Sequence, residues 1–242
     1  MKIKVETMCD SLRDCIVSEK YGADRIELNS GSHLGGLTPS LGLLIQAKTQ
    51  TNIPVLPMIR CRMGGFTYSD IEYDTMYLDA KLMLENGADG IVYGFLNEDR
   101  SINIEMTKKF TDLAKEYKKE AIFHRAFDRT QDPYTSIETL IDLRIDRILT
   151  SGLKENVTDG LDLIKDLQEK YGDQIEILPG AGITHENAKY IIDYTKTNQI
   201  HGSFKELIKI PTSTFTYEKE TAYDYQQINP KHLKEVVKIV AT

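Results

Sequence analysis

The sequence predicts an α/β fold, and within that class a (β/α)8 TIM-like barrel built as a single domain over residues 1–242. The length fits, because barrels of this kind usually form one core from about 250 residues. Short apolar segments alternate with amphipathic helical segments from end to end, which is typical of parallel strands joined by helical crossovers. A short repeated sequence is the third observation, and it favours a ring of repeated units.

The repeat precedes every second predicted strand. It reads Gly22-Ala23-Asp24-Arg25-Ile26 before the second strand, Gly87-Ala88-Asp89-Gly90-Ile91 before the fourth, and Ile145-Asp146-Arg147-Ile148 before the sixth. A period of two strands suits a closed barrel of eight units, although a doubly wound sheet can also carry repeated turns.

Eight strands are predicted in chain order, at residues 2–9, 25–29, 53–60, 90–96, 121–128, 147–151, 174–179 and 199–203. The helices between them begin at capping sequences or prolines, and several end at glycine. The predicted starts are Ser11, Pro39, Ser69, Pro133 and Thr184, and the predicted glycine ends are Gly22, Gly87 and Gly172. Residues 204–229 show neither period and are predicted to form a long loop, before a final helix over 230–240.

Composition excludes several classes of partner. Lys and Arg number 30 against 37 Asp and Glu, for a net charge of −7, and the basic residues are scattered, so no nucleic-acid partner is expected. No segment approaches the roughly 18 apolar residues needed to cross a bilayer, so we expect no membrane association and a cytoplasmic protein. Three cysteines without CxxC spacing argue against a disulfide framework or a structural zinc site.

Polar residues gather at the carboxyl ends of the predicted strands, where the strands of a barrel meet at one mouth. Buried parallel strands are normally apolar, so each exception needs a partner or a role. Side-chain alternation places His124 with Asp128, Glu6 with Met8, and Glu27 with Asn29 on common faces. The predicted catalytic residues are Glu6, Glu27, His124, Arg125 and Asp128.

A second set of residues at the same ends is predicted to bind a small anionic substrate, comprising Arg60, Arg62, Ser151, Gly180, Gly182, His201 and Ser203. The glycine-rich turn of residues 179–184 follows the seventh strand, where many barrels bind phosphate, although an ordinary tight connection reads the same way. A purely structural reading also stays open, in which Glu6, Glu27, Arg60 and Arg125 form a buried ion-pair network that fills the upper layer of the barrel.

Sulfur-bearing residues near the same mouth are candidate metal ligands. Met8 and Cys9 end the first predicted strand, and Cys61 follows the third. Thiolate and thioether sulfur favour Cu(I), but methionine and cysteine are also ordinary core residues, and the spacing matches no chelating motif.

Together these motifs resemble the CutC copper homeostasis family. The resemblance is carried, in chain order, by GADRIEL, GGLTPS, PMIRCR, YSDIE, FHRAFD, RILTSG, PGAGI and HGS, and it extends from the first strand to about Ser203. The recurrent polar residues of the family match Glu6, Glu27, Arg60, Arg62, His124, Arg125, Asp128 and His201.

The resemblance implies a cytoplasmic TIM-like barrel, often a homo-oligomer such as a dimer or tetramer, linked to copper tolerance and Cu(I) binding. Relatives for which copper binding is proposed carry cysteine where this chain has Met8 and Asn29, and Cys61 stands where the family usually has proline. Two hypotheses follow: a copper-binding homeostasis protein, or an enzyme of lyase, isomerase or hydrolase type acting on a small anionic or phosphorylated metabolite. The sequence does not decide whether the chain is an enzyme.

Overall fold

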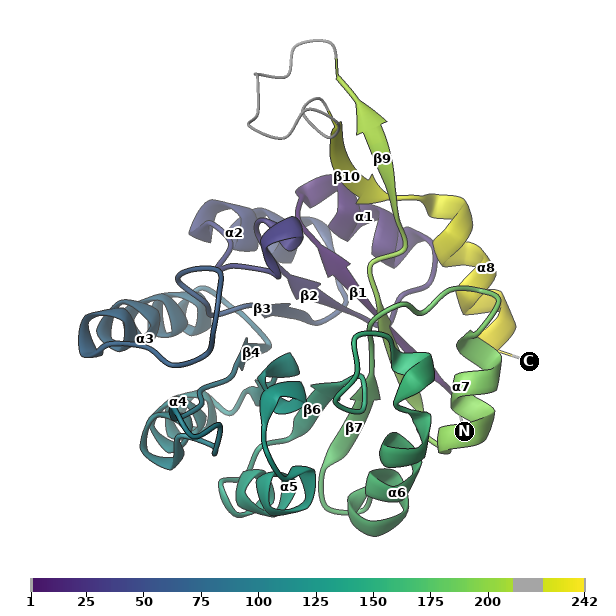
Figure 1. Ribbon diagram of the computed structural model, residues 1–242. Coiled ribbons are helices and arrows are strands. Elements are labelled where there is room, and N and C mark those ends of the chain that lie inside the picture. The colour runs from purple at the N-terminus through teal and green to yellow at the C-terminus, as the bar shows by residue number, and fades with distance from the viewer. Residues whose placement is uncertain (1, 211–223, 242) are drawn as a thin grey trace.

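A ring of parallel strands surrounded by helices forms the body of the molecule in the computed structural model, which describes residues 2–210 and 224–241 (Figure 1). The strands of the ring are β1 Lys4–Cys9, β2 Arg25–Leu28, β3 Val55–Pro57, β4 Gly90–Tyr93, β5 Glu120–Phe123, β6 Arg147–Thr150, β7 Glu176–Pro179 and β8 Gln199–Gly202. The predicted (β/α)8 TIM-like barrel is confirmed.

The helices alternate with these strands and form the outer layer (Figure 1). They are α1 Leu12–Lys20, α2 Leu41–Gln50, α3 Asp70–Glu85, α4 Ile104–Glu116, α5 Pro133–Asp142, α6 Leu161–Tyr171, α7 Ala188–Thr195 and α8 Pro230–Val240. Three short 3-10 helices lie in loops, at Ser32–Leu34, Arg125–Arg129 and Val157–Asp159.

Parallel ladders join the strands in the order β3-β2-β1-β8 and β4-β5-β6-β7. One seam between these halves is bridged by backbone, because Met58 pairs with Val92 in parallel and the Ile59 N–H donates to the Val92 carbonyl at 2.7 Å. At the other seam the Gln199 side chain on β8 donates to the Ile177 carbonyl on β7 at 3.4 Å.

The repeated sequence before β2, β4 and β6 has a structural reason in its aspartates, Asp24, Asp89 and Asp146, called here the aspartate latches. Each carboxylate accepts the backbone N–H of a residue near the start of the preceding odd-numbered strand. The bonds are Val5 N to Asp24 at 2.9 Å, Val55 N to Asp89 at 2.9 Å, and Ala121 N to Asp146 at 2.7 Å. Each latch therefore ties one βαβ unit together, and each also pairs with a lysine.

The barrel interior divides into an apolar and a polar side. Leu56, Met58, Val92 and Ile122, on or next to β3, β4 and β5, form a small buried cluster distinct from the main core between strands and helices. Ionisable side chains from β1, β2, β6 and β8 are buried on the other side of the ring. The apolar cluster supplies packing, and the polar side carries Glu6, Glu27 and His201.

The predicted strand over residues 121–128 is wrong in its second half. β5 ends at Phe123, and Arg125–Arg129 forms a 3-10 helix. The turn is fixed by His124, whose Nδ1 accepts the Ala126 N–H at 3.1 Å and whose carbonyl accepts the Phe127 N–H at 3.1 Å. His124 and Asp128 therefore do not share one strand face.

Helix starts were predicted with mixed success. The Glu72 carboxylate accepts the Ser69 N–H at 2.7 Å, Ser11 accepts the Asp14 N–H at 3.1 Å, and Pro133 opens α5 as expected. The starts at Pro39 and Thr184 are wrong, because α2 begins at Leu41 after the Ser40 cap and α7 begins at Ala188. Gly22 and Gly87 have positive φ angles as expected for helix ends, whereas Gly172 is right-handed.

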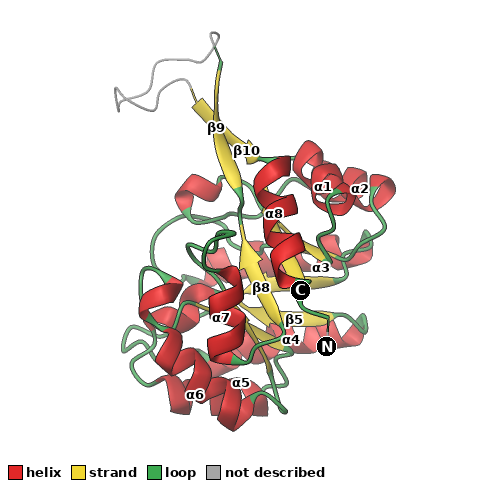
Figure 2. Ribbon diagram, turned by 90° about the vertical axis from the view of Figure 1, so that its right-hand side faces the viewer, coloured by secondary structure: helices red, strands yellow, loops and turns green. Residues whose placement is uncertain are grey.

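The predicted long loop over residues 204–229 is wrong where the structure describes it. β9 Lys205–Lys209 and β10 Asp224–Ile228 form an antiparallel hairpin that leaves the carboxyl end of β8 (Figure 2), and residues 211–223 lie outside the described residues. The Ile228 N–H donates to Asp14 on α1 at 2.8 Å, which anchors β10 before the predicted final helix, α8. No helix in the described part of the chain has the length and apolar character needed to span a bilayer.

The aspartate latches give a direct stability test. Asp89→Ala leaves the Val55 N–H without its carboxylate acceptor, so we expect a loss of about 1–3 kcal/mol in the free energy of unfolding, measured by urea denaturation. Asp89→Asn retains an acceptor oxygen and should cost less. Asp74→Ala, on the exposed face of α3, is the control and should change stability by no more than about 0.5 kcal/mol. Equal losses for Asp89→Ala and Asp74→Ala would contradict the latch.

Candidate functional site

A cavity of about 660 Å³ opens at the carboxyl ends of the barrel strands. Its walls come from nearly every part of the ring, which is where barrels build their active sites. The lining residues include Met8, Glu27, Met58, Arg60, Phe66, His124, Arg125, Gly182, His201 and Ser203. Eight of these ten were predicted as site residues; Met58 and Phe66 were not.

Glu27 is a buried carboxyl in the cavity wall, with 2% of its surface exposed. Its Oε1 accepts a hydrogen bond from Asn29 Nδ2 at 2.8 Å, so the predicted shared face of these two residues is confirmed. Burial raises the pKa of the Glu27 carboxyl, and the nearby His201 opposes that rise only in part. Glu27 therefore holds a proton more readily than an exposed glutamate.

His201 is buried beside Glu27 and is held by a second glutamate. Its Nδ1 lies 2.8 Å from Glu6 Oε1. Burial alone would lower the pKa of His201, but the fields of Glu27 and Glu6 and the bond to Glu6 outweigh it, so the pKa is raised. With raised pKa values on both, Glu27 and His201 are neighbours suited to exchanging a proton with a ligand.

Glu6 itself lies below the cavity wall and stays ionised. Burial would raise its pKa, but the Arg25 guanidinium, the His201 bond and Arg147 together hold the pKa of Glu6 far below its ordinary value. Because its oxygens contact Arg25 and His201, Glu6 positions the imidazole and fixes its charge. Glu6 therefore supports His201 from below and does not itself line the cavity.

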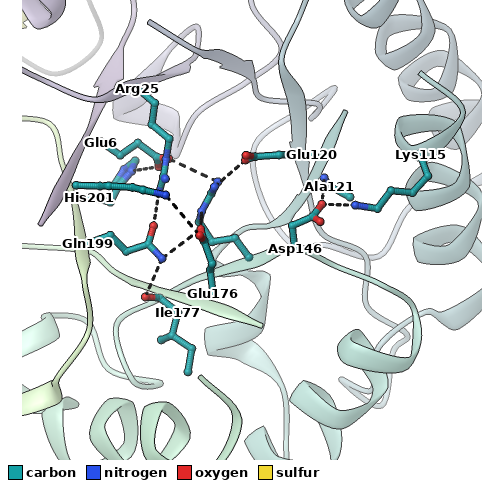
Figure 3. A network of polar contacts seen from close by, with 12 residues as sticks. Glu6, Arg25, Lys115, Glu120, Ala121, Asp146, Glu176, Ile177, Gln199 and His201 are labelled. Carbon is teal, nitrogen blue, oxygen red and sulfur yellow. Dashed lines mark hydrogen bonds and ion pairs between the residues drawn. The ribbon is translucent and has the colours of Figure 1, made fainter. Parts of the chain in front are cut away.

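A network of charged side chains continues from Glu6 through the buried Arg25 and Arg147 to the partly exposed Glu120 and Glu176 (Figure 3). Arg25 donates to Glu6 and to Gln199, and Arg147 donates to Glu120 at 2.7 Å and to Glu176 at 2.8 Å. We call Glu6, Arg25, Glu120, Arg147, Glu176 and Gln199 the barrel-floor network. The alternative of a purely structural network of Glu6, Glu27, Arg60 and Arg125 is not what the structure shows, because only Glu6 belongs to the barrel-floor network, while Glu27, Arg60 and Arg125 line the cavity.

His124 lines the opposite part of the cavity in the neutral state. Its Nδ1 accepts the Ala126 N–H, and among the described residues its buried Nε2 has no hydrogen-bond partner. Burial and the positive charge of Arg60 lower the pKa of His124 to about 3. Two histidines in one cavity thus have opposite tendencies, because His201 has carboxylate neighbours and His124 has a guanidinium.

Arg60 reaches the cavity from the segment after β3 and is buried. Its terminal nitrogens donate to the carbonyls of Gly35 at 3.1 Å, Gly36 at 3.3 Å and Gly64 at 2.7 Å. Its guanidinium carbon lies 5.0 Å from the Phe66 ring centre, while its Nε has no partner within the part of the chain that the structure describes. The guanidinium is fixed in place with one N–H unused.

Asp128 has a structural role and does not line the cavity. Its carboxylate accepts from Thr150 Oγ1 at 2.6 Å, Ser151 Oγ at 2.9 Å and the Leu153 N–H at 3.2 Å. Arg125 donates to Asp128 at 2.7 Å and to Ser151 at 2.8 Å. Of Arg125, Asp128 and Ser151, only Arg125 lines the cavity. Together they hold the loop after β6 in place.

Arg62 and two predicted sulfur ligands also lie outside the cavity lining. Arg62 pairs with Glu72 and stacks over Tyr68, at 4.8 Å from the ring centre. Strand alternation turns Cys9 outward toward α1, where its Sγ lies 3.3 Å from Ser18 Oγ, and Cys61 is half-buried near Arg62. Met8 alone of the predicted ligand set lines the cavity.

The glycine-rich turn contributes backbone to the cavity. A Cβ at Gly180 would meet Leu149 at 2.7 Å and a Cβ at Gly182 would meet the Asn156 amide at 2.4 Å, so a larger residue would displace a neighbouring side chain, and Gly182 also has a φ of +82° that favours glycine. Gly182 also lines the cavity, whereas Gly180 supports it from behind. The proposal that this turn binds phosphate stays a prediction.

Sequence reasoning missed several residues that shape the site. Arg25, Arg147 and Gln199 are polar residues at the starts of buried strands. The rule that a polar residue in a buried parallel strand needs a partner or a role applies to them as well. Phe66 lies in an irregular loop, and its ring contacts His124 at 4.9 Å between centres. No periodicity marks such a residue in the sequence.

One group of described residues could hold a metal ion: Glu6, Glu27 and His201 have ligand atoms within 4.8 Å of one another. Carboxylate and imidazole suit harder ions, whereas Cu(I) prefers sulfur. Burial and the neighbouring Cys15 raise the pKa of the Cys9 thiol, which disfavours the thiolate that binds metal. The side chains of Met8, Cys9 and Cys61 therefore do not form one metal site. The sulfur-bearing residues that line the cavity are methionines.

Comparison with known proteins agrees with this architecture. The family model described as "CutC family" matches residues 3–206. A CutC protein of Treponema denticola is 46% identical over 82% of this chain and 80% of its own length, and the human "Copper homeostasis protein cutC homolog" is 41% identical over 82% and 72%.

Solved structures give the same result. A CutC protein from Streptococcus agalactiae superposes with a TM-score of 0.78 at 33% identity, covering 83% of this chain and 98% of its own. Phosphoribosylanthranilate isomerase from Thermotoga maritima aligns at a TM-score of 0.59 but 11% identity, which shows a shared barrel fold alone. On the evidence of the family model, the relatives and the barrel, this chain belongs to the CutC family.

Proposed function

We propose that this chain serves in copper homeostasis and that the cavity at the barrel mouth is where it acts. The support is the extent of the match to the human protein whose name carries that role, which covers the strands that build the cavity. Free thiols at Cys9, Cys15 and Cys61 suit the proposed reducing cytoplasm. A dimer or tetramer is proposed from the family resemblance.

Copper enters this proposal as Cu(I) cargo held by thioether sulfur. Met8 and Met58 both line the cavity, and His201 is the nearby imidazole. Thioether and imidazole are both accepted ligands of copper, whereas the thiols lie elsewhere. The single observation that carries the proposal is that Met8 and Met58 line, together with histidines, one cavity of about 660 Å³ in a CutC-family barrel.

Anaerobic Cu(I) titration against a competing chelator tests this placement. We expect Met8→Leu to weaken Cu(I) binding by about tenfold or more, because it removes a soft ligand while preserving apolar volume. Cys61→Ser is the matched control and should bind as the wild type does, since Cys61 does not line the cavity. A larger loss from Cys61→Ser than from Met8→Leu would place the metal elsewhere.

A second candidate is an enzyme acting on a small anionic or phosphorylated metabolite, and specific contacts favour it. Arg60 carries an unused N–H in the cavity wall, and Glu27 with His201 supplies a proton-transfer pair. A positive clamp beside an acid–base pair suits proton abstraction next to a carbonyl or another reaction that moves a proton. In this role Arg60 orients the anion, and Glu27 and His201 exchange protons with it.

The two arginines that the sequence treats alike provide the test. In a thermal-shift screen of anionic metabolites, we expect ligands that stabilise the wild type to lose that effect with Arg60→Met, because the cavity loses its fixed positive charge. Arg60→Lys should keep part of the shift and controls for loss of packing. Arg62→Met should respond as the wild type does, since Arg62 pairs with Glu72 outside the cavity lining. Equal responses from Arg60→Met and Arg62→Met would contradict the anion clamp.

A further inference from the structure

The imidazole of His124 is fixed in one orientation by its surroundings. Nδ1 accepts the Ala126 N–H at 3.1 Å. Gly94 packs against the same ring edge, where a Cβ would lie 2.5 Å from Nδ1. The ring of Phe66 covers it at 4.9 Å between centres. Rotation of the ring is therefore blocked on several sides, and Gly94 acts as a positioning residue.

This orientation determines where the proton sits on the ring. A neutral imidazole has one donor and one acceptor nitrogen, and Nδ1 is already the acceptor of a backbone N–H. Nε2 must then carry the hydrogen. His124 accordingly presents an N–H donor, and its free nitrogen cannot act as a base.

That donor is buried without an acceptor among the described residues, and so is a second one nearby. His124 is 4% exposed and Arg60 is 5% exposed, yet His124 Nε2 and Arg60 Nε lack partners. Phe66 contacts both side chains, and all three residues line the same cavity. An unpaired buried donor destabilises the fold, more so when it is charged, and a hydrogen bond to a ligand oxygen would remove that cost.

We propose that His124 is a neutral hydrogen-bond donor that, together with Arg60, receives an anionic oxygen of the ligand, and that it is not the acid or base of the site. The ligand class is a small organic anion bearing a phosphate or carboxylate group. The inference rests on the proposed anion-binding function and assigns separate roles within it. His124 and Arg60 bind the anionic oxygen, and Glu27 and His201 transfer protons. The structure thereby revises the prediction of His124 as a catalytic acid or base.

The electrostatics agree with this geometry. Burial and the Arg60 charge both disfavour a second proton on the ring, and the pKa of His124 is lowered to about 3. A donor that stays neutral across the physiological range binds an anion without exchanging a proton with it. Neutral imidazole donors of this kind polarise oxygen in other barrel enzymes.

Nitrogen-15 NMR of the full chain labelled at histidine tests the proposal, with His124→Gln used to assign the signal. Two-bond spectra distinguish the two neutral tautomers from the imidazolium. We expect His124 in the Nε2–H form from pH 5 to 8, and a shift of its Nε2–H signal when inorganic phosphate or acetate is added. An Nδ1–H tautomer, or an imidazolium at pH 6, would overturn the inference whether or not an anion binds.

Binding of the same two probes to variants completes the test. His124→Phe should weaken the binding of whichever probe the wild type binds by about tenfold or more, while His124→Gln, which keeps an N–H donor, should lose less. Stronger binding of phosphate than acetate would identify the ligand as a phosphate ester, and the reverse a carboxylate. Anion binding unchanged in His124→Phe overturns this inference alone, whereas no binding by the wild type overturns the anion-binding function as well.

The buried neutral ring also predicts a pH-dependent stability. The folded-state pKa lies below the ordinary 6.5, so His124 stabilises the fold fully above pH 6.5 and loses that contribution as pH falls toward about 3. Between pH 6.5 and 5 only the unfolded state takes up this proton. The unfolding equilibrium of the wild type should therefore shift toward unfolding by up to about tenfold per pH unit relative to His124→Gln. Urea midpoints that run parallel in pH for the two proteins would contradict a buried neutral His124.

Discussion

The buried contact between Glu6 and Arg25 is the constraint on which the rest of the interior depends. Both side chains are almost fully buried. Burial removes water from both charges, and this desolvation cost offsets much of the electrostatic attraction between them. The loss is tolerable because Arg25 also donates to Gln199 and Glu6 also bonds His201. His201, Gln199 and Arg147 are the buried polar groups that these two side chains contact.

One consequence is a division of labour between the floor and the mouth. The ionised Glu6 keeps its charge because two guanidiniums face it, and that charge in turn favours a proton on His201. Glu27 lies in the cavity wall above Glu6, with no ion pair to a guanidinium among the described residues, and burial raises its pKa. The same residue type thus acts as a fixed charge at Glu6 and as a proton carrier at Glu27, because the neighbours differ.

The sequence predicted the barrel well because the evidence for it is local and repeated. The alternation of strand and helix segments and the aspartate repeat can each be recognised within a short stretch of sequence. The site was predicted less well, since the strand over residues 121–128 was extended through a turn that His124 itself creates. Strand periodicity then placed Asp128 at the cavity, whereas a 3-10 helix takes it to the loop after β6.

Other features had no local signal. Arg60 and Arg62 stand two residues apart in one motif, and only the fold shows that one enters the cavity and the other pairs with Glu72. Cys9 was grouped with Met8 by position, yet adjacent residues of a strand face opposite sides. The hairpin of β9 and β10 lacks apolar alternation because it is largely exposed, so it resembled a loop.

The aspartate latches bear on how such a ring can be assembled at all. Each latch bond joins residues only 19, 34 or 25 positions apart, so little chain entropy is lost when it forms. Contacts of short separation form early, ahead of the circular closure that links the first strand to the eighth. The latches thus tie β1 to β2, β3 to β4 and β5 to β6 through short stretches of chain, whereas the pairing of β1 with β8 brings the most distant strands of the ring together.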